Sequence, residues 1–554
     1  MAIVSPTPSP SASFNYTRLK QPTRVIPFPS STTTRVAISS RLKSSKPLNS
    51  KKDSFSSSSS SSSMNLEFES DSDSDYELQY EFPIPRRKKG SLVYVTLPID
   101  AVDSLGKVKR VKAMSYSFKA LALAGVEGVV MEVWWGLVER DAPLSYDWRS
   151  YLEIVALAKH FGLKVRPVMA FHSFGVPGDS CWIPLPHWVR QVMIEQPDLA
   201  FSDRFGRRNG EYISLGCDVL PVLKGRSPMQ AYSDFMRSFR DTFQEHLGIT
   251  VTGIQVGMGP AGELRYPSCP SQKLAWSWRF RELGEFQCYD KYMLASLNAC
   301  AQKVGMREWG NGGPLGAGNL MQNPEETEFF KSDGSWNTPY GRFFLEWYSG
   351  MLLLHGERLC MMAETIFWGT GVSISGKLAG MHWHYGTESH PSELTAGYYN
   401  TSIRDGYLPI ARLFGRYGLI LCCTGFEMRD SEEKQMHPLS SPEGLLRQIL
   451  LAARASDLPL DGENSAARLS NQSLQQVLKM SRFYSDGLDE LFFSFNFVRM
   501  GQTLFERDNW TRFTEFVKQI SHGSNFQAKL NFGGSELCLS TSAAKKVRVA
   551  LAYC

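Results

Sequence analysis

The stretch Gly128-Val-Val-Met-Glu-Val-Trp134 is almost entirely apolar and has the length of a single strand. Its apolar residues do not alternate with polar ones, and such runs are typical of parallel strands that are covered on both faces. A longer amphipathic stretch separates it from the next apolar run, which begins at Lys164. Because strands that alternate with helical stretches indicate βαβ units, this part of the chain predicts an α/β fold with a parallel sheet.

The same pattern occurs eight times along the chain. The runs are Leu92–Pro98, Gly128–Trp134, Lys164–Phe171, Gly253–Met258, Gly376–Trp383, Gly418–Cys423, Leu458–Asp461 and Leu491–Val498. Eight such runs favour a single closed (β/α)8 barrel of the TIM type, with long loops on the face formed by the carboxyl ends of the strands. A doubly wound open sheet is the alternative, although no Gly-x-Gly-x-x-Gly pattern follows the first run.

Helical periodicity is clearest in three of the intervening segments. Ser115–Leu123 has an apolar side, and Ala231–Leu247 carries phenylalanines four residues apart, which indicates a face packed on a core. The third expected helix, Phe286–Val304, lies in a Gly-, Pro- and aromatic-rich insertion between about Pro267 and Asn337. Long loops on a barrel usually build its active-site face, so we expect this insertion to border the site.

The ends of the chain differ in composition from the middle. Residues 1–63 are rich in Ser, Thr and Pro, contain Lys and Arg, and hold no acidic residue before Asp53. This composition indicates a disordered organelle transit peptide, with an untargeted disordered tail as the alternative. Residues 64–90 change from acidic to basic and are expected to be a charged linker. We expect the barrel to span residues 91–522 and a C-terminal tail to span residues 523–554.

Charge and cysteine content exclude several classes of protein. The formal net charge is +5, but nine Lys and Arg residues lie at or before Lys52, so the remainder of the chain is net negative. Nothing therefore favours nucleic-acid binding by the folded part. The sequence contains no run of about 18 uncharged apolar residues, so a membrane-spanning helix is not expected. The ten cysteines contain no Cys-x-x-Cys pair and form neither a zinc pattern nor a compact disulfide framework.

Polar side chains gather where the predicted strands end. In a barrel these ends meet on one face, where the reacting groups lie. Carboxylates, aromatic rings and hydrogen-bonding groups are the mixture that sugars need, and two facing carboxyl groups suffice for glycoside hydrolysis. The candidates in or just after the eight runs are Glu132, His172, Asp179, Glu263, Lys377, His382, Thr424, Asn464, Glu463 and Arg499.

Each of these features has a simpler structural explanation. A glutamate after a strand is more often the partner of a structural ion pair than a catalyst, and Glu263 by itself favours that explanation. His382 and His384 would lie on one face of a strand at the spacing of metal ligands, but no further ligands are grouped with them. Gly259-Pro-Ala-Gly262 is compatible with a phosphate cradle at a helix N-terminus, although it lacks the Lys-Ser/Thr pair of a P-loop.

Taken together, the segments resemble the plant β-amylases of the glycoside hydrolase family 14 type, from about Leu92 to about Val517. The motifs that carry the resemblance are Val129-Val-Met-Glu-Val-Trp-Trp-Gly136, Gly257-Met-Gly-Pro-Ala-Gly-Glu-Leu-Arg-Tyr-Pro267, Gly284-Glu-Phe-Gln-Cys-Tyr-Asp-Lys291, Glu393-Leu-Thr-Ala-Gly-Tyr-Tyr-Asn400 and Glu427-Met-Arg-Asp430. The resemblance implies exo-acting, inverting hydrolysis of α-1,4-glucosidic bonds in starch or maltodextrin, with release of β-maltose and no cofactor or metal. His382-Trp-His-Tyr385 resembles the plastid members, which agrees with a transit peptide to the chloroplast stroma.

The resemblance also implies roles for individual residues. Glu263 would be the general acid and Glu463 the general base, about 6.5–9.5 Å apart as in inverting enzymes. Thr424 would position groups around the scissile bond, and Asp179 would be the acidic tip of a mobile lid. The remaining expected substrate-contact or supporting residues are Glu132, His172, Lys377, His382, Asn464 and Arg499.

Several positions depart from the family pattern. Glu132 stands where the family usually has the shorter Asp, and the lid sequence Gly175-Val-Pro-Gly-Asp179 is one residue shorter than the usual Gly-Gly-Asn-Val-Gly-Asp. Pro177 fixes its own φ and removes a hydrogen-bond donor from that lid. The family's Asn-Phe-Thr-Cys is Cys-Cys-Thr424-Gly here. These departures keep open an alternative, a catalytically weak or inactive glucan-binding regulator of starch breakdown with regulatory protein partners.

Overall fold

The computed structural model describes residues 90–269, 283–320, 322–485 and 493–521. The predicted transit peptide, the C-terminal tail from residue 523 and all but the last residue of the predicted linker lie outside these ranges. The description below therefore concerns the barrel and its loops.

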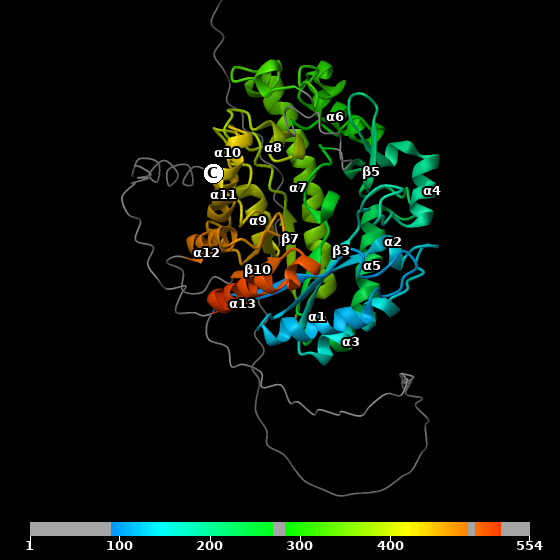
Figure 1. Cartoon of the computed structure of the whole chain (residues 1–554). Coiled ribbons are helices and arrows are strands. Elements are labelled where there is room, and N and C mark those ends of the chain that lie inside the picture. Colours follow the sequence, from blue (N-terminus) through cyan, green and yellow to red (C-terminus); the bar gives the residue numbers. More distant parts are fainter. Residues whose placement is uncertain (1–89, 270–282, 321, 486–492, 522–554) are drawn as a thin grey trace, which may run out of the picture. The chain divides into compact units, whose positions relative to one another are not determined.

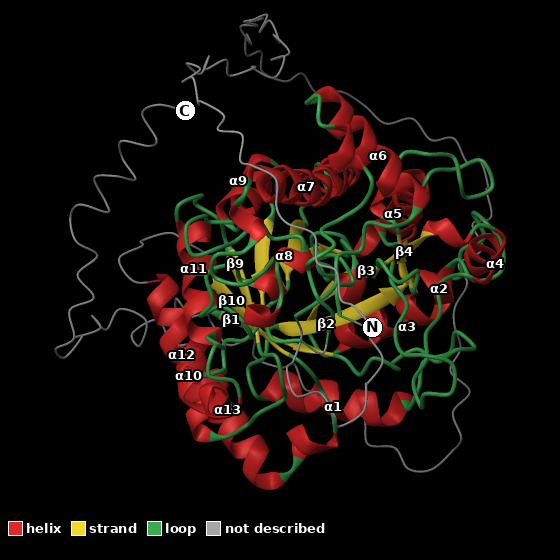
Figure 2. Cartoon of the chain, turned by 90° about the horizontal axis from the view of Figure 1, so that it is seen from above, coloured by secondary structure: helices red, strands yellow, loops and turns green. Residues whose placement is uncertain are grey.

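Eight parallel strands close into a barrel in the order β1-β10-β9-β8-β7-β6-β3-β2. Figure 1 shows the strands with the helices packed around them, and Figure 2 shows the strands enclosed by the ring of helices. The predicted (β/α)8 barrel is confirmed, and the open-sheet alternative is wrong. The strands are β1 (Leu92–Thr96), β2 (Gly128–Trp134), β3 (Lys164–Ala170), β6 (Gly253–Val256), β7 (Ser373–Leu378), β8 (Ile420–Cys423), β9 (Leu460–Glu463) and β10 (Phe493–Phe497).

The first quoted stretch forms the longest strand pair of the barrel. β2 pairs with β3 over seven residues, from Gly128 opposite Lys164 to Trp134 opposite Ala170. A Cβ atom on Gly128 would lie 2.2 Å from the carbonyl oxygen of Lys164, so only glycine permits this start. All but one residue of β2 are buried, the exception being Glu132, which is only partly exposed. The near-continuous apolar run thus reflects a strand covered on both faces.

The helices that follow the strands supply the outer layer. The described helices are α1 (Val111–Leu123), α2 (Trp135–Val138), α3 (Arg149–His160), α4 (His187–Glu195), α5 (Pro228–Thr242), α6 (Lys291–Lys303), α7 (Pro339–Phe367), α8 (Pro391–Ala396), α9 (Leu408–Arg416), α10 (Asp430–Met436), α11 (Pro442–Arg454), α12 (Asn471–Ser485) and α13 (Arg507–Ser521). None of these helices combines the length and apolarity that crossing a bilayer requires.

Capping residues fix the helix starts that periodicity left open. Ser227 and Gln230 form a capping box before α5, and Pro228 occupies its first position. Asp290 accepts hydrogen bonds from the backbone of Tyr292 and Met293, so α6 begins at Lys291 and not at Phe286 as the sequence predicted.

The fifth strand lies earlier in the sequence than predicted. β7 ends at Leu378, and the next backbone N–H, that of Ala379, donates to the Tyr398 hydroxyl at 3.0 Å and so leaves the ladder. His382 and His384 consequently lie in the loop after β7, and the expectation that they share one face of a strand is wrong. The apolar run continued past the strand because the loop itself is buried.

Two features of the fold had no counterpart in the prediction. A β-hairpin of β4 (Ala200–Ser202) and β5 (Arg208–Ile213) stands apart from the barrel, within the loop that follows β3. Inside the barrel, Arg166 lies 3.8 Å above the Tyr94 ring and donates to Asp461 at 3.0 Å and Ser494 at 2.9 Å. Asp461 of this buried polar layer lies two residues before the carboxyl end of β9, where the candidate site begins.

Candidate active site

A tight turn after β6 carries Glu263. A Cβ atom on Gly259 would lie 2.5 Å from the carbonyl oxygen of Glu263, so the turn requires glycine there. Ala261 has φ of 54°, and its N–H donates to Glu211 Oε1 at 2.9 Å, which holds this less favourable backbone conformation. Leu264 N then donates to Lys377 O at 2.8 Å, so Glu263 lies beside the end of β7.

Glu463 is the last residue of β9 and is buried. Its Oε2 lies 2.8 Å from Lys377 Nζ, and its Oε1 accepts from Asn496 Nδ2 at 2.8 Å. Burial raises the pKa of Glu463, but Lys377, Asn496 and Cys422 outweigh burial and lower it below its ordinary value. Glu463 is therefore ionised at neutral pH, as a general base must be.

Lys377 links the two glutamates. Its Nζ lies 2.8 Å from Glu463 Oε2 and 4.0 Å from Glu263 Oε1, so these two oxygens are separated by no more than the sum of those distances. Burial alone would lower the pKa of Lys377, but the carboxylates of Glu463 and Glu263 raise it above its ordinary value. The two carboxyl groups thus face one ammonium group between them.

The two carboxyl groups have different neighbours. Arg265 Nε donates to Glu263 Oε2 at 2.8 Å. His172 packs edge-on against Trp134, with ring centroids 5.2 Å apart. Burial, followed by the charges of Arg265 and Lys377, lowers the pKa of His172 to about 3, so its imidazole is neutral at physiological pH. Both glutamates thus share Lys377, but Glu263 has the Arg265 guanidinium as its second partner, whereas Glu463 has the closer ammonium and the Asn496 amide.

Glu132 and Arg499 form an ion pair across the barrel rim. Arg499 Nη2 lies 2.7 Å from Glu132 Oε1, and Nη1 donates to the backbone oxygen of Leu97 at 2.6 Å. The longer side chain of Glu132 thus has a fixed cationic partner that also anchors the segment after β10 to the end of β1. A ligand that approached Glu132 would compete with this ion pair.

The loops after β8 and β9 are joined by hydrogen bonds. Glu427 accepts from the backbone N–H groups of Ser465 at 3.0 Å and Ala466 at 2.8 Å. Asn464 accepts from Val498 N at 2.8 Å and donates back to the Val498 carbonyl. Asn464 therefore joins the loop after Glu463 to the segment after β10. Thr424 is half-buried and shares a small cavity with His382.

The two histidines after β7 are held by separate serines. His382 Nδ1 lies 2.8 Å from Ser440 Oγ, and His384 Nδ1 lies 2.7 Å from Ser392 Oγ. Burial, followed by the charge of His437, lowers the pKa of each to about 4. Across the described ranges, no group of three His, Cys, Asp or Glu side chains is arranged to hold a metal ion.

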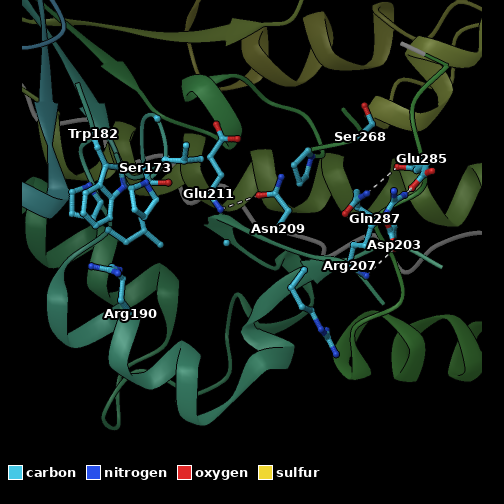
Figure 3. A pocket seen from close by; sticks show the side chains of 18 of the residues that line it. Ser173, Trp182, Arg190, Asp203, Arg207, Asn209, Glu211, Ser268, Glu285 and Gln287 are labelled. Carbon is cyan, nitrogen blue, oxygen red and sulfur yellow. Dashed lines mark hydrogen bonds and ion pairs between the residues drawn. The ribbon is translucent and has the colours of Figure 1, made fainter. Parts of the chain in front are cut away.

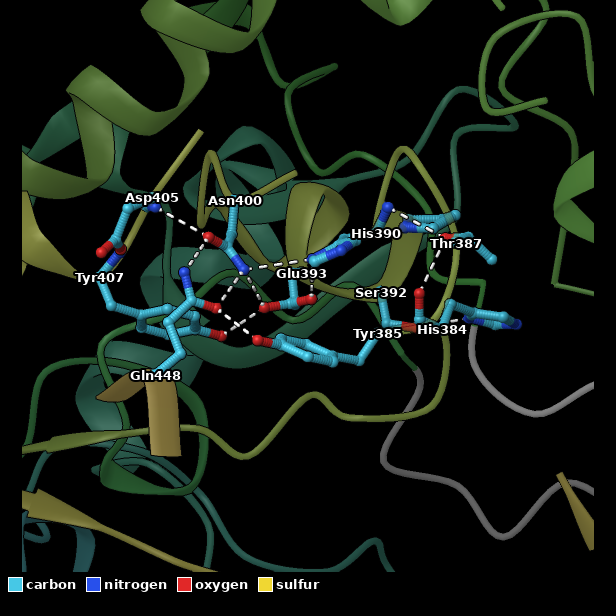
Figure 4. Close-up of polar contacts among 12 residues, drawn as sticks. His384, Tyr385, Thr387, His390, Ser392, Glu393, Asn400, Asp405, Tyr407 and Gln448 are labelled. Atoms are coloured by element: carbon cyan, nitrogen blue, oxygen red, sulfur yellow. Dashed lines mark hydrogen bonds and ion pairs between the residues drawn. The ribbon is translucent and has the colours of Figure 1, made fainter. Parts of the chain in front are cut away.

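A buried polar network supports the loop that carries these histidines. Figure 4 shows Glu393 at its centre, with His390, Asn400 and Tyr407 around it. Glu393 Oε1 accepts from Tyr407 at 2.8 Å and from Asn400 Nδ2 at 2.9 Å, and its Oε2 lies 2.8 Å from His390 Nδ1. Gln448 of α11 bonds Asn400, which ties the loop to the outer helices.

The predicted lid is a loop closed at its base. Phe174 and Ile183 exchange two backbone hydrogen bonds of 2.8 Å. Pro177 and Gly178 occupy the centre of a β-turn in which Asp179 N donates to Val176 O at 3.0 Å, and Gly178 has φ of 99°. The exposed Asp179 carboxylate accepts from Val176 N at 3.0 Å. The structure thus places Asp179 in the turn of its own loop, whereas the other candidates lie around the barrel mouth.

Three residues of the site were missed by sequence reasoning about strand ends. Asn496 lies within β10 and donates a hydrogen bond to Glu463. The alternation of polar Ser494 and Asn496 with phenylalanines in this strand could have indicated that both side chains point to one face. Arg265 follows Glu263 by two residues and was quoted only as part of a motif. Glu211 lies on β5, in a hairpin that was not predicted, and no pattern in the sequence connected it with Glu263.

Comparison with known proteins agrees with this geometry. Residues 94–525 match the family described as Glycosyl hydrolase family 14. The chain is 52% identical over 440 residues to Beta-amylase 1, chloroplastic, of Arabidopsis thaliana, covering 78% of this chain and 76% of that protein. It is 40% identical over 450 residues to Inactive beta-amylase 4, chloroplastic, of the same plant, covering 78% and 83%.

A solved structure supports the same assignment. The catalytic domain of β-amylase from Paenibacillus polymyxa superimposes with a TM-score of 0.63 at 25% identity, covering 78% of this chain and 100% of that chain. The family match over residues 94–525 includes the turn that carries Glu263 and the strand end that carries Glu463. The chain therefore belongs to glycosyl hydrolase family 14.

Proposed function

We propose that this protein is a β-amylase that hydrolyses α-1,4-glucosidic bonds from the non-reducing ends of starch or maltodextrin and releases β-maltose. The observation that carries the proposal is the pair of carboxyl groups, Glu263 and Glu463, held in unlike surroundings on either side of Lys377. Unlike surroundings are what an acid and a base in one site require. The family membership and the similarity to named β-amylases support the substrate class.

In the proposed mechanism, Glu463 accepts a proton from a water molecule as that water attacks the anomeric carbon. Glu263 donates a proton to the glycosidic oxygen on the opposite side, and the bond to the departing glucan breaks. Attack from the face opposite the leaving group inverts the configuration, which gives β-maltose from an α-linkage. Proton exchange with solvent then returns Glu463 to its ionised state and Glu263 to its acid form.

The other candidates support these two steps. Lys377 keeps Glu463 ionised, and the neutral His172 can donate or accept a hydrogen bond to a sugar hydroxyl without adding charge next to Glu263. Glu132 and Arg499 offer a carboxylate and a guanidinium to sugar hydroxyls at the rim. Asn464 holds the loop after Glu463, Thr424 lies beside that loop, and Asp179 would reach the substrate only after movement of the lid.

The place of action is part of the proposal. The relative with the name Beta-amylase 1 is described as chloroplastic, and the basic, Ser-rich residues 1–63 have the composition of a transit peptide. We propose that the mature barrel acts in the plastid stroma. Import of a fusion of residues 1–90 to a fluorescent protein into isolated chloroplasts would test this assignment, with a fusion that lacks residues 1–63 as the control.

Proton NMR of the mature chain with maltopentaose tests the activity. The expected result is early appearance of the β-anomeric signal of maltose, followed by slow mutarotation to the α-anomer. Glu263→Gln and Glu463→Gln variants should both lose this signal. Early release of α-maltose, or of glucose, would contradict an inverting exo-hydrolase that removes maltose.

A second candidate function is a glucan-binding regulator with little or no turnover. Two observations favour it: Glu132 is already occupied by Arg499, and the shorter lid binds its Asp179 within its own turn. Glucan binding without any maltose signal in the same NMR experiment would support this second function and refute the first. Regulatory protein partners would then become the object of the search.

A further inference from the structure

A second cavity lies beside the acid end of the site. It has a volume of 460 Å³, which is within the range of about 300–1,000 Å³ typical of small-molecule sites. Its walls come from the lid, α4, the β4–β5 hairpin and the insertion that precedes α6. Figure 3 shows Trp182 and Arg190 at one end, Arg207 and Glu285 at the other, and Glu211 and Asn209 between them.

The charges of this cavity are mostly neutralised within its own wall. Arg207 pairs with Asp203 at 2.5 Å and also with Glu285, and Arg208 pairs with Asp198 at 2.9 Å. Guanidinium groups that already bind carboxylates are poor anchors for a phosphate or another anion. Besides Arg190 and Glu211, the remaining polar lining consists of amides and hydroxyls such as Asn209, Gln287 and Ser268, which suits a neutral polyhydroxyl ligand.

One aromatic side chain offers a platform for a sugar ring. Trp182 lines the cavity from the descending arm of the lid. The Arg190 guanidinium lies 5.1 Å from the centroid of the indole, within the range of cation–π contacts, and helps to hold the ring in place. An aromatic face with hydrogen-bonding groups opposite is the arrangement that binds the C–H face of a glucosyl residue.

The cavity borders the turn that carries the proposed general acid. Glu211 is one of its lining residues, and Glu211 Oε1 accepts from the N–H of Ala261, two residues before Glu263. Glu263, as the acid, protonates the oxygen that leaves with the departing chain, whereas the attacking water lies on the side of Glu463. The cavity wall at Glu211 therefore adjoins the turn whose glutamate would protonate the oxygen of the departing chain.

We propose that this cavity is an outer glucan subsite in which Trp182 stacks on glucosyl residues of the departing chain. The inference rests on the proposed site at Glu263 and Glu463, but it concerns binding and does not require turnover. It assigns to Trp182 a role in chain-length preference: long maltodextrins reach the cavity, whereas short ones occupy only the barrel mouth.

Isothermal titration calorimetry tests the proposal, with Glu463→Gln as the common background so that no glucan is consumed. Trp182→Ala should weaken the binding of maltoheptaose by about twofold to twelvefold, the effect of losing an aromatic stacking contact. The binding of maltotriose should not change. Trp182→Phe should give an intermediate loss, and Trp368→Ala, which removes a largely exposed tryptophan at the end of α7, should leave both affinities unchanged.

Two results would overturn the proposal. One is an unchanged affinity of the Trp182→Ala variant for maltoheptaose. The other is an equal loss for maltoheptaose and maltotriose, because Trp182 would then act through the lid and not through an outer subsite. An enzyme that releases β-maltose while Trp182→Ala has no effect refutes only the subsite. A chain without turnover whose maltoheptaose binding depends on Trp182 refutes only the proposed β-amylase activity.

Discussion

Replacing Lys377 with methionine should move the acidic limb of the pH–rate profile to higher pH. The ammonium lies 2.8 Å from Glu463 Oε2, and a pair of unit charges at that distance interacts with about 6 kcal/mol at an effective dielectric constant of about 20. Without the ammonium, the effect of burial on Glu463 is no longer outweighed, so the pKa of Glu463 should rise. The base must be ionised, so kcat/KM falls as pH decreases through the pKa of Glu463, and the variant should lose activity at higher pH than the parent.

The assay is kcat/KM for maltopentaose hydrolysis across about pH 4–9. Lys377→Arg keeps a positive charge near Glu463 and should shift the acidic limb less than Lys377→Met. Lys109→Met is the matched control, because it removes a partly exposed lysine from its ion pair with Asp100. If Lys377→Met lowered kcat/KM by the same factor at every pH, the assignment of Lys377 as the group that keeps the base ionised would be refuted.

Four further outcomes are expected. Glu263→Gln should reduce kcat by about 10²–10⁴-fold while maltotriose binding measured by calorimetry persists, and loss of binding would contradict a role as acid. Asn496→Leu should raise the pKa of Glu463 and shift the acidic limb in the same direction as Lys377→Met, by a smaller amount. The folded pKa of His172 is depressed from about 6.5 to about 3, so the stability that it contributes is present above about pH 6.5 and is lost as pH falls. We compare the unfolding free energy at about pH 7 and about pH 4.5 in urea titrations. It should decrease by about 3 kcal/mol less in His172→Gln than in the parent, because the variant lacks this imidazole. Arg499→Met should lower the unfolding free energy by about 3 kcal/mol, because it leaves the Glu132 carboxylate without its partner, and the double variant with Glu132→Gln should recover part of that loss.

The barrel could be predicted from sequence because its strands are covered on both faces. Continuous apolar runs such as Gly128–Trp134 mark strands of that kind, and their number favoured a closed barrel over an open sheet. The same signal misplaced β7, since the loop after Leu378 is also buried and continues the apolar run to Trp383. The hairpin of β4 and β5 gave too short a pattern for detection, because one of its strands has only three residues.

The site was predictable at the level of which residues follow the strands. Glu263, Lys377 and Glu463 do meet at the barrel mouth, because the carboxyl ends of parallel strands converge there. Their partners could not be inferred, since a hydrogen bond such as that from Asn496 to Glu463 depends on strand register. The position of Asp179 also depended on local turn geometry: the Pro177-Gly178 turn directs its carboxylate back to Val176.

The two backbone hydrogen bonds between Phe174 and Ile183 make the lid a loop whose two ends are joined to each other. The eight residues between these positions begin and end at one hydrogen-bonded pair, so we expect that a change in their length or sequence leaves the register of β3 and the packing of α4 unaltered. The longer Gly-Gly-Asn-Val-Gly-Asp segment could therefore be inserted between Phe174 and Ile183 while these two hydrogen bonds are kept.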